Sequence, residues 1–472
     1  MRERYTLLEL KKLHLGLQWK RAYSEIAIGI AVCLALAPFT WDSDMQIWYI
    51  VSKDIGNGLT PYASGYFSYP PIWAYISYFV TFHLNSAVGS PSFANIINPN
   101  YNNPLRDALS PDPVFVTTPT FNLLVKLPLI FAYALVGLLI YEYLTRCTGD
   151  GKKALSGMRL WLFNPLVLYV SAVAGQFDVL PALCVFIGTI LFVRKNYSYS
   201  AIALAIGTML KLFPVYIALL FSVLLFVNSI KPILTPNLSG WTRRIRYLAT
   251  FVGSFVIGNL LILVPLYFTG ALTGFIYANS LRYSIFPGAG GATIFDLIYA
   301  PRIENIVSDF LVQNLKPLST GLLIGSIAIT TALGLFSWKR VRLREEDIFA
   351  LVLISGCIAL FSLLTVNPQY ILWILPVVII VYSTKGFSKR WIWVLSVCMT
   401  VFGLLWNFPL APLAFSSSRG VSQAVLSMSQ IYTVFIDSYL FPKIAALTGL
   451  LSALILYRFV HLSAKTLVER LE

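Results

Sequence analysis

The sequence predicts an all-α protein that crosses a membrane many times. Of its 472 residues, 57% are hydrophobic and only 12% are charged. Apolar runs of bilayer length recur along the chain, and such runs are typical of transmembrane helices rather than of a soluble domain. The runs are continuous rather than alternating, which favours helices over a transmembrane barrel.

Twelve spans are predicted from these runs. The first resembles a signal peptide, with a basic flank and Ala-Leu-Ala at 35–37, but its apolar run continues to Trp41, so we expect a retained anchor. The fifth is short for a full crossing, and we expect it to be tilted or broken at 211–214, Lys-Leu-Phe-Pro. The predicted spans are 22–41, 121–143, 158–174, 177–193, 198–210, 212–228, 247–268, 318–337, 347–365, 369–383, 391–407 and 441–460.

The distribution of charge predicts the orientation of the spans. The net charge is +15, which in a soluble protein would suggest a nucleic-acid partner. Here the basic residues form short clusters between apolar runs, so we expect no nucleic acid and apply the positive-inside rule. Both termini are then cytoplasmic, and the long loops 42–120, 269–317 and 408–440 lie on the other side. Because these loops carry many of the carboxylates, we expect the chemistry on the non-cytoplasmic face.

The whole chain, 1–472, reads as one integral membrane domain. A first external loop covers 42–120, a membrane core with an external loop at 269–317 covers 121–383, and C-terminal helices follow at 384–472. Within the first loop, 42–60 and 69–84 read as helices at the membrane surface and 85–120 as an irregular loop. In the first of these helices, the residues expected to face lipid are Met45, Trp48, Tyr49 and Ile55.

A carboxylate pair follows the first span directly. Asp42 and Asp44 occur in Thr-Trp-Asp-Ser-Asp, where the chain should leave the bilayer. Ionisable residues at that depth are costly, and residues two apart do not share one face. One carboxylate is therefore a candidate general base for an acceptor hydroxyl, and the other a candidate for positioning it or holding a metal. The alternative is two solvated acids at a helix end.

A second polar group ends the third predicted span. Gln176 and Asp178 lie in Gly-Gln-Phe-Asp, a short distance after Asn164-Pro165. Such groups at a span end can face a polar cavity shared with the first loop. The alternative is that Asp178 caps the N–H groups of the next helix, and both interpretations can hold together.

Lys211 is the most informative basic residue. It lies among apolar residues on the acidic side of the predicted topology, and a cation there needs a counter-anion. A lipid phosphate is a good candidate, whereas the alternative is a side chain that reaches to the interface. Arg282 is a second, weaker candidate, because it could equally pair with a loop acid such as Asp296.

Aromatic and amide residues at span mouths are candidates for contacts with a sugar. Tyr62 and Tyr69 lie in the first loop, and Gln369 and Tyr370 lie in Asn-Pro-Gln-Tyr. Phenol and amide groups can hydrogen-bond a sugar, and tyrosine rings can stack on one. The alternative is an aromatic belt that anchors the protein at the interface. The three histidines and five cysteines form no metal-ligand pattern.

Taken together, these motifs resemble the polytopic GT-C glycosyltransferases that use lipid-phosphate sugars. The nearest types are GPI mannosyltransferase I and the prokaryotic polyprenyl-phosphate-mannose-dependent mannosyltransferases. The matching elements, spread over about 41–380, are the acidic pair after the first span, Gly58-x-x-Pro61-Tyr62, Tyr69-x-Pro71, Asn164-Pro165, Gln176-x-Asp178, Lys211-x-x-Pro214 and Gln369-Tyr370-x-x-Trp373. The 85–120 segment looks longer and richer in Asn and Pro than that pattern.

The resemblance implies a GT-C-like bundle with juxtamembrane helices in the first loop. It implies inverting transfer of a sugar, mannose before glucose or arabinose, from a polyprenyl- or dolichyl-phosphate donor to a glycan or glycolipid acceptor. Asp42 or Asp44 would be the base, and Lys211 with Arg282 would bind the donor phosphate. No cofactor is certain; the acidic pair is compatible with Mg²⁺ or Mn²⁺ without requiring it. A small membrane-protein partner is compatible with the family.

Such an enzyme would work in membrane lipid, in the plasma membrane of a prokaryote or in the endoplasmic reticulum. The principal alternative is a transporter or flippase for a lipid-linked glycan. Inverted repeats and charges along a central path would favour it, and the sequence shows neither. A non-enzymatic scaffold would not need carboxylates and a lone lysine at span mouths on one face.

Overall fold

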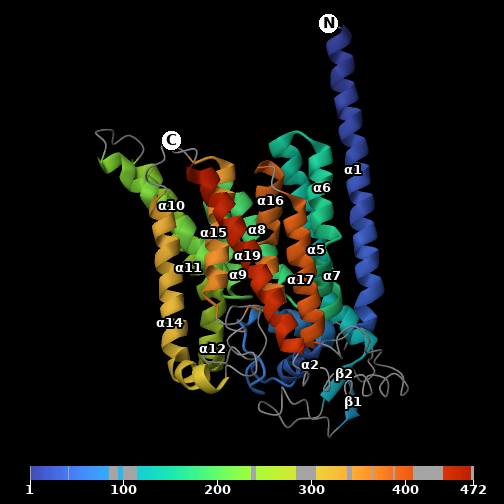
Figure 1. Cartoon of the computed structure of the whole chain (residues 1–472), viewed down its shortest axis with the longest axis vertical. Helices are drawn as coiled ribbons and strands as arrows, with labels where there is room; N and C mark the ends of the chain where they lie inside the picture. Colours follow the sequence, from blue (N-terminus) through green and yellow to red (C-terminus); the bar gives the residue numbers. More distant parts are fainter. Residues whose placement is uncertain are drawn as a thin grey trace.

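A computed structural model describes residues 2–40, 42–83, 94–98, 114–234, 241–282, 304–336, 343–363, 366–385, 388–407 and 440–468. Its described part is almost entirely helical, and the long helices lie side by side in one bundle (Figure 1). Helix α1 begins and α19 ends at one end of the bundle, whereas α2 and strands β1 and β2 lie at the opposite end (Figure 1). We call this opposite end the α2 end.

The first half of the bundle contains the elements up to α10. They are α1 (Arg2–Leu36), η1 (Ala37–Phe39), α2 (Ser43–Gly56), α3 (Ile72–Tyr78), η2 (Phe79–His83), β1 (Ala94–Asn98), β2 (Val114–Thr117), α5 (Pro119–Thr148), α6 (Gly151–Leu162), α7 (Pro165–Leu168), η3 (Tyr169–Ala174), α8 (Val179–Val193), α9 (Tyr197–Thr208) and α10 (Pro214–Leu234).

The second half contains eight further described elements. They are α11 (Trp241–Phe268), α12 (Ala271–Arg282), α14 (Glu304–Phe336), α15 (Glu345–Phe361), η6 (Pro368–Trp373), α16 (Leu375–Lys385), α17 (Lys389–Asn407) and α19 (Leu440–Val468).

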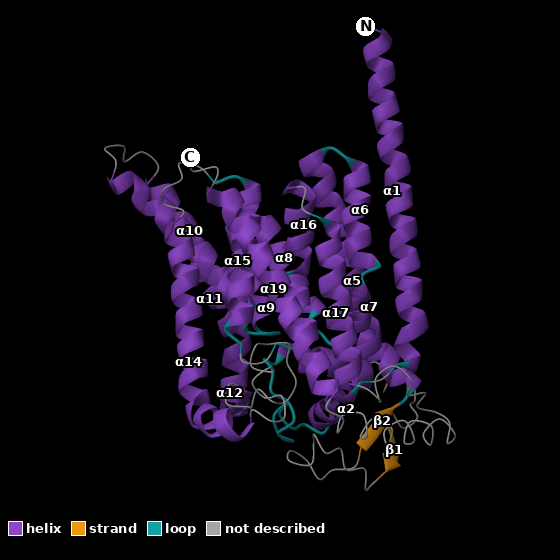
Figure 2. Ribbon diagram, in the orientation of Figure 1, coloured by secondary structure: helices purple, strands orange, loops and turns teal. Residues whose placement is uncertain are grey.

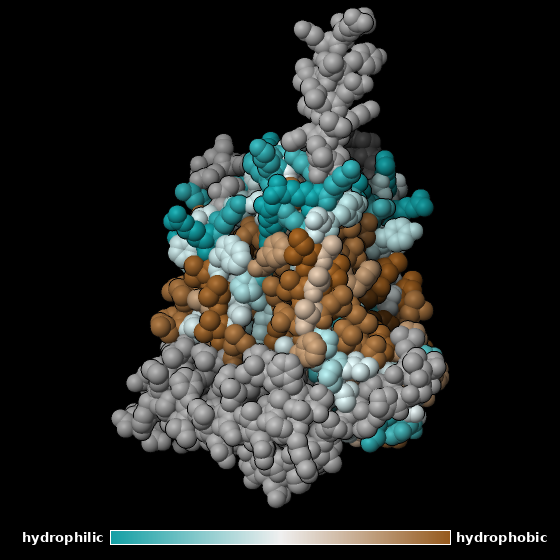
Figure 3. All heavy atoms as spheres, turned by 90° about the vertical axis from the view of Figure 1, so that its right-hand side faces the viewer, coloured by the Kyte–Doolittle hydropathy of each residue, from teal (hydrophilic) through white to brown (hydrophobic). Residues whose placement is uncertain are grey.

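The prediction of a multi-pass helical membrane protein is confirmed. Among the described residues, five segments are long and apolar enough to cross a bilayer, and a sixth is obtained if α6 and the helical turns after it form one bent span. The count of twelve spans stays a prediction. The surface fits a membrane, because a hydrophobic band crosses the middle of the bundle on the face shown in Figure 3. The five segments are Gln18–Phe39, Pro119–Thr148, Trp241–Phe268, Pro317–Phe336 and Leu447–Lys465.

Two details differ from the sequence-based expectations. The span 158–174 is not one straight helix, because the chain bends by 47° between α6 and Pro165. Proline keeps the residue before it extended, and the Asn164 side chain then caps α7 through the N–H groups of Leu166 and Val167. The segment 85–120 is also not wholly irregular: β1 and β2 pair in an antiparallel two-stranded sheet (Figure 2). By contrast, the predicted break at 211–214 is confirmed, since α9 ends at Thr208 and α10 begins at Pro214.

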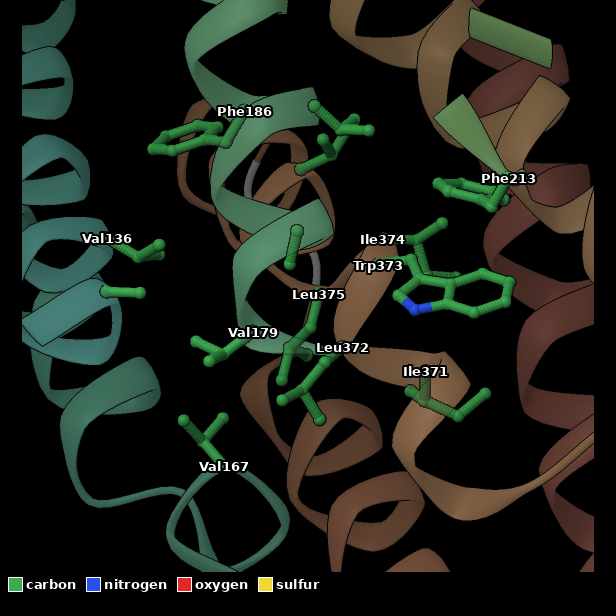
Figure 4. Packing of buried hydrophobic residues seen from close by; sticks show 14 of the residues in the cluster. Val136, Val167, Val179, Phe186, Phe213, Ile371, Leu372, Trp373, Ile374 and Leu375 are labelled. Carbon is green, nitrogen blue, oxygen red and sulfur yellow. The ribbon is translucent and has the colours of Figure 1, made fainter. Parts of the chain in front are cut away.

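The core of the bundle is formed by apolar side chains from α5, α8, η6 and α16. Figure 4 shows Val179 beside Leu372 and Leu375, with Val136 and Phe186 in the same cluster. On the outside, α11 leaves apolar side chains uncovered, such as Leu261, which is 71% exposed. In a membrane such a surface faces lipid tails, so this exposure costs nothing there.

One turn connects the core to the α2 end of the bundle. Gly175 follows η3 with φ +68°, a left-handed conformation that favours glycine. A Cβ atom at this position would lie 2.7 Å from Met45 Sδ and 2.9 Å from Lys126 Cε. The turn, α2 and α5 therefore meet where only glycine fits.

We expect Gly175→Ala to destabilise the protein more than Gly149→Ala does. Both residues have left-handed φ, but Gly149 has no atom near the position of a Cβ. The shared backbone strain is about 1–2 kcal/mol, and overpacking adds about 1–3 kcal/mol at Gly175 alone. Thermal unfolding in detergent measures the difference. Equal losses for the two variants would contradict the close packing at Gly175.

Candidate functional site

The two carboxylates of the first loop have different surroundings. Asp42 is buried, with 1% of its surface exposed, and its Oδ1 accepts the N–H of Asp44 at 3.1 Å as the N-cap of α2. Asp44 lies in the first turn of α2 and is only half-buried. Its Oδ2 accepts a hydrogen bond of 2.5 Å from Gln176 Nε2. Asp42 is therefore placed for a structural role as a helix cap, whereas the carboxylate of Asp44 is still partly exposed.

Helix α2 is held against the protein by its aromatic side. Trp48 is fully buried, contacts the rings of Tyr69, Trp73 and Phe177, and donates its indole N–H to Gly175 O at 3.3 Å. The expectation that Met45 and Trp48 face lipid is therefore wrong. Ring packing and a carbonyl partner for the indole N–H are available on the protein side, and a lipid-facing indole would have neither.

The turn after Gly175 places a buried ion pair beside this packing. The Lys211 ammonium lies 2.5 Å from Asp178 Oδ1, and the same oxygen accepts the indole N–H of Trp373 at 2.7 Å. Asp178 is at the N-cap position of α8, but its side chain makes no capping hydrogen bond. The predicted capping alternative is therefore wrong, because the carboxylate is turned towards a full positive charge in a site of low dielectric.

Aromatic rings surround the Lys211 ammonium. The distances from Nζ to the ring centroids are 4.6 Å for Tyr370, 4.9 Å for Phe177, 5.1 Å for Tyr69 and 5.4 Å for Trp373. All lie within the range of cation–π attraction. We call these four rings with Asp178 the Lys211 cage. The counter-anion that the sequence required for Lys211 is thus present in the chain, and contact with a lipid phosphate stays a prediction.

Two buried acceptors beside the cage lack a partner. Gln176 Oε1 and Asp178 Oδ2 are inaccessible and accept no hydrogen bond from the residues that the structure describes. A buried acceptor left in this state costs about 1–3 kcal/mol. Hydroxyl groups of a bound ligand would satisfy both atoms.

Fewer contacts define the roles of the other predicted site residues. Tyr62 is buried and donates its hydroxyl to Tyr69 O at 3.0 Å; burial raises the pKa of Tyr62, so it stays a protonated donor. Gln369 is half-buried in η6, next to Tyr370. Arg282 is the last residue of α12, but its side chain and Asp296 lie outside the described residues.

Lys126 belongs to this region and was not predicted from the sequence. It is fully buried in α5, and its ammonium donates to Ala37 O at 3.1 Å, Thr40 O at 2.7 Å, Thr40 Oγ1 at 2.9 Å and Val173 O at 2.9 Å. The available signal was a single lysine inside an apolar run, close to the end that carries the acidic loop.

The donor set gives little support for a metal site. Among the described residues, no group of three or more His, Cys, Asp or Glu is placed to hold an ion. Near α2 the candidate metal ligands are Asp42, Asp44 and Gln176. The amide nitrogen of Gln176, which is not a metal ligand, is the atom that faces Asp44. Mg²⁺ and Mn²⁺ prefer near-octahedral oxygen sites, which these groups do not complete.

Comparison with known proteins places the chain in no family. No protein-family model matches it, and no curated protein matches it.

We expect the Lys211–Asp178 pair to be strongly coupled. Asp178→Asn should cost about 3–5 kcal/mol, because it leaves a buried ammonium without its counter-ion. Adding Lys211→Met should recover part of this loss, and chemical unfolding in detergent measures each step. The control is Glu142→Gln, which breaks the partly exposed pairs of Glu142 with Arg146 and Arg194 and should cost less than about 1 kcal/mol. An equal cost for Asp178→Asn and Glu142→Gln would contradict the coupling.

Proposed function

We propose that this chain is a membrane glycosyltransferase with a GT-C-like bundle of twelve spans. It transfers a sugar, mannose in the first instance, with inversion from a polyprenyl- or dolichyl-phosphate donor to a glycan or glycolipid acceptor. One observation carries the proposal: a half-buried carboxylate, Asp44, and a buried cation, Lys211, are bonded to the same turn, through Gln176 and Asp178 respectively. A base and a cation close together are what this displacement needs.

Asp44 is the base in this proposal. Its carboxylate takes the proton of the acceptor hydroxyl as that oxygen attacks the anomeric carbon of the donor. The bond between this carbon and the phosphate oxygen breaks on the opposite face, so the configuration inverts and the lipid phosphate leaves with the electron pair. The proton on Asp44 then passes to solvent. Asp42 is buried and caps α2, so we assign it a supporting role.

Lys211 provides positive charge for the leaving phosphate. An ammonium has three N–H donors, and one of them is directed at Asp178. A preorganised cation that faces the developing charge lowers the barrier most in a site shielded from water. Arg282 at the end of α12 is the second donor of positive charge in the proposal.

The sugar lies beside the cage in this proposal. Gln176 Oε1 and Asp178 Oδ2 accept its hydroxyl groups, which would satisfy both buried atoms. Tyr69 and Tyr370 offer ring faces, and Tyr62 and Gln369 supply further polar contacts. These residues come from three separate parts of the chain, and contacts of Tyr69, Asp178 and Tyr370 with Lys211 support a common site.

The topology proposed for this enzyme puts the α2 end outside the cytoplasm. Both termini are then cytoplasmic, together with exposed basic residues such as Lys152, Lys153 and Lys195. The membrane is the plasma membrane of a prokaryote or the endoplasmic reticulum, with the lipid-linked donor and acceptor on the same non-cytoplasmic side.

We expect Asp44→Asn to reduce transfer from radiolabelled polyprenyl-phosphate mannose by about 10²–10⁴-fold, because it removes the proton acceptor. Asp150→Asn is the matched control: asparagine caps a helix as well as aspartate does, and Asp150 caps α6, away from the α2 end. Purified protein in detergent with an acceptor mixture serves as the assay. Absence of transfer by the native protein from mannosyl, glucosyl and arabinosyl donors would reject the function, and full activity of Asp44→Asn would reject the base.

A further inference from the structure

Lys126 has no role in the chemistry proposed above, yet it is among the most completely buried charges in the described part of the chain. Its ammonium binds two carbonyls at the end of the first span, those of Ala37 and Thr40. It also binds Val173 O, two residues before Gly175. One side chain thus joins the segment that leads into α2 to the segment that leads into the turn at 175–178.

Carbonyl oxygens carry only partial charge, so a buried ammonium also needs a full counter-charge. Asp42 is buried two residues after Thr40, whose carbonyl and hydroxyl both accept hydrogen bonds from Lys126, and this places its carboxylate within electrostatic range of the ammonium. Met45 and Lys126 both pack close to Gly175, which shows how tightly α2 and α5 approach here.

We infer that Lys126 and Asp42 form a buried charge pair that fixes Thr40, Asp42 and Asp44 against 173–176, which makes Lys126 a positioning residue for Asp44. The pairing stands independently of any reaction. Its consequence for turnover rests on the proposed function, because it assumes that Asp44 is the base.

Lys126 could instead be a simple packing element that holds only carbonyls. A charge pair and a purely carbonyl-bound lysine predict different effects of Asp42→Asn on stability once Lys126 has been replaced. In the native background, Asp42→Asn removes the counter-charge of a buried ammonium and destabilises the protein. In a Lys126→Met background, the same change removes a buried carboxylate that has lost its cation, and it stabilises the protein. Asparagine keeps the cap of α2 in both backgrounds.

The experiment compares four purified proteins in detergent by thermal unfolding: native, Asp42→Asn, Lys126→Met and the double variant. We expect each single variant to lower the melting temperature by about 5 °C or more, and the double variant to melt above Lys126→Met. Lys53→Met is the control, because Lys53 is exposed on α2 and its loss should leave the melting temperature within about 1 °C of native. If Lys126→Met does not fold, recovery of a folded double variant is the supporting result.

A second measurement tests positioning. For variants that fold, Lys126→Met should lower kcat by about 100-fold through misplacement of Asp44, with KM within about twofold of native. The double variant should regain stability without regaining kcat, because the carbonyls of Ala37, Thr40 and Val173 still lack the ammonium that binds all three. A purely structural lysine would give stability and kcat that recover together.

The inference is overturned if Asp42→Asn lowers the melting temperature equally in both backgrounds, or if Lys126→Met melts like the native protein. It is also overturned if neither Lys126→Met nor the double variant folds while Asp42→Asn does. Absence of transfer by the native protein rejects the proposed function alone, since the unfolding measurements need no substrate.

Discussion

The buried ammonium of Lys126 is the interaction on which the α2 end of the bundle depends. The first span ends in a short turn, η1, whose carbonyls have no helical partner. In a bilayer no water is present to satisfy them, and an unpaired carbonyl costs several kcal/mol. Lys126 satisfies the carbonyl of Ala37 in η1 and that of Thr40, the residue after η1, and it also binds Val173 O in η3. Asn122, one helical turn earlier in α5, supports this with a hydrogen bond to Pro38 O at 3.3 Å.

A second buried cation stabilises the neighbouring part of the site by a different means. Lys211 has one carboxylate oxygen and four ring faces around it, where Lys126 has mainly carbonyls. Ring faces attract a cation without competing for its hydrogen bonds, so the ammonium stays held while two donors remain available. Trp373 takes part twice, as a ring face and as a donor to Asp178, and thus orients both charges. The same ring packs on Phe213 in the core (Figure 4).

Both cations lie where segments distant in sequence come together. The residues that contact them lie in separate parts of the chain, at 37–40, 69, 173–178 and 370–373. The helices themselves are long, and several expose apolar side chains that suit lipid. The polar groups, by contrast, are concentrated at breaks between helices: after η1, at Asn164-Pro165, at 175–178 and at 211–214. Irregular backbone at such depth is tolerated only when it is buried in protein or lines a cavity, so the breaks and the buried charges occur together.

The sequence by itself determined the class of fold and the break before Pro214. These follow from apolar run length and from the geometry of proline, which are local properties. It also identified Asp42, Asp44, Gln176, Asp178 and Lys211 as polar groups in costly places. Only the tertiary structure decided their partners: Gln176 bonds to Asp44, Asp178 neutralises Lys211 instead of capping α8, and Trp48 faces protein instead of lipid. The tertiary structure also decided the role of Lys126. A lysine in an apolar run does not indicate which distant carbonyls it will bind. Which opposite charge lies beside a buried lysine depends on how the helices pack, because the two residues can be far apart in the sequence.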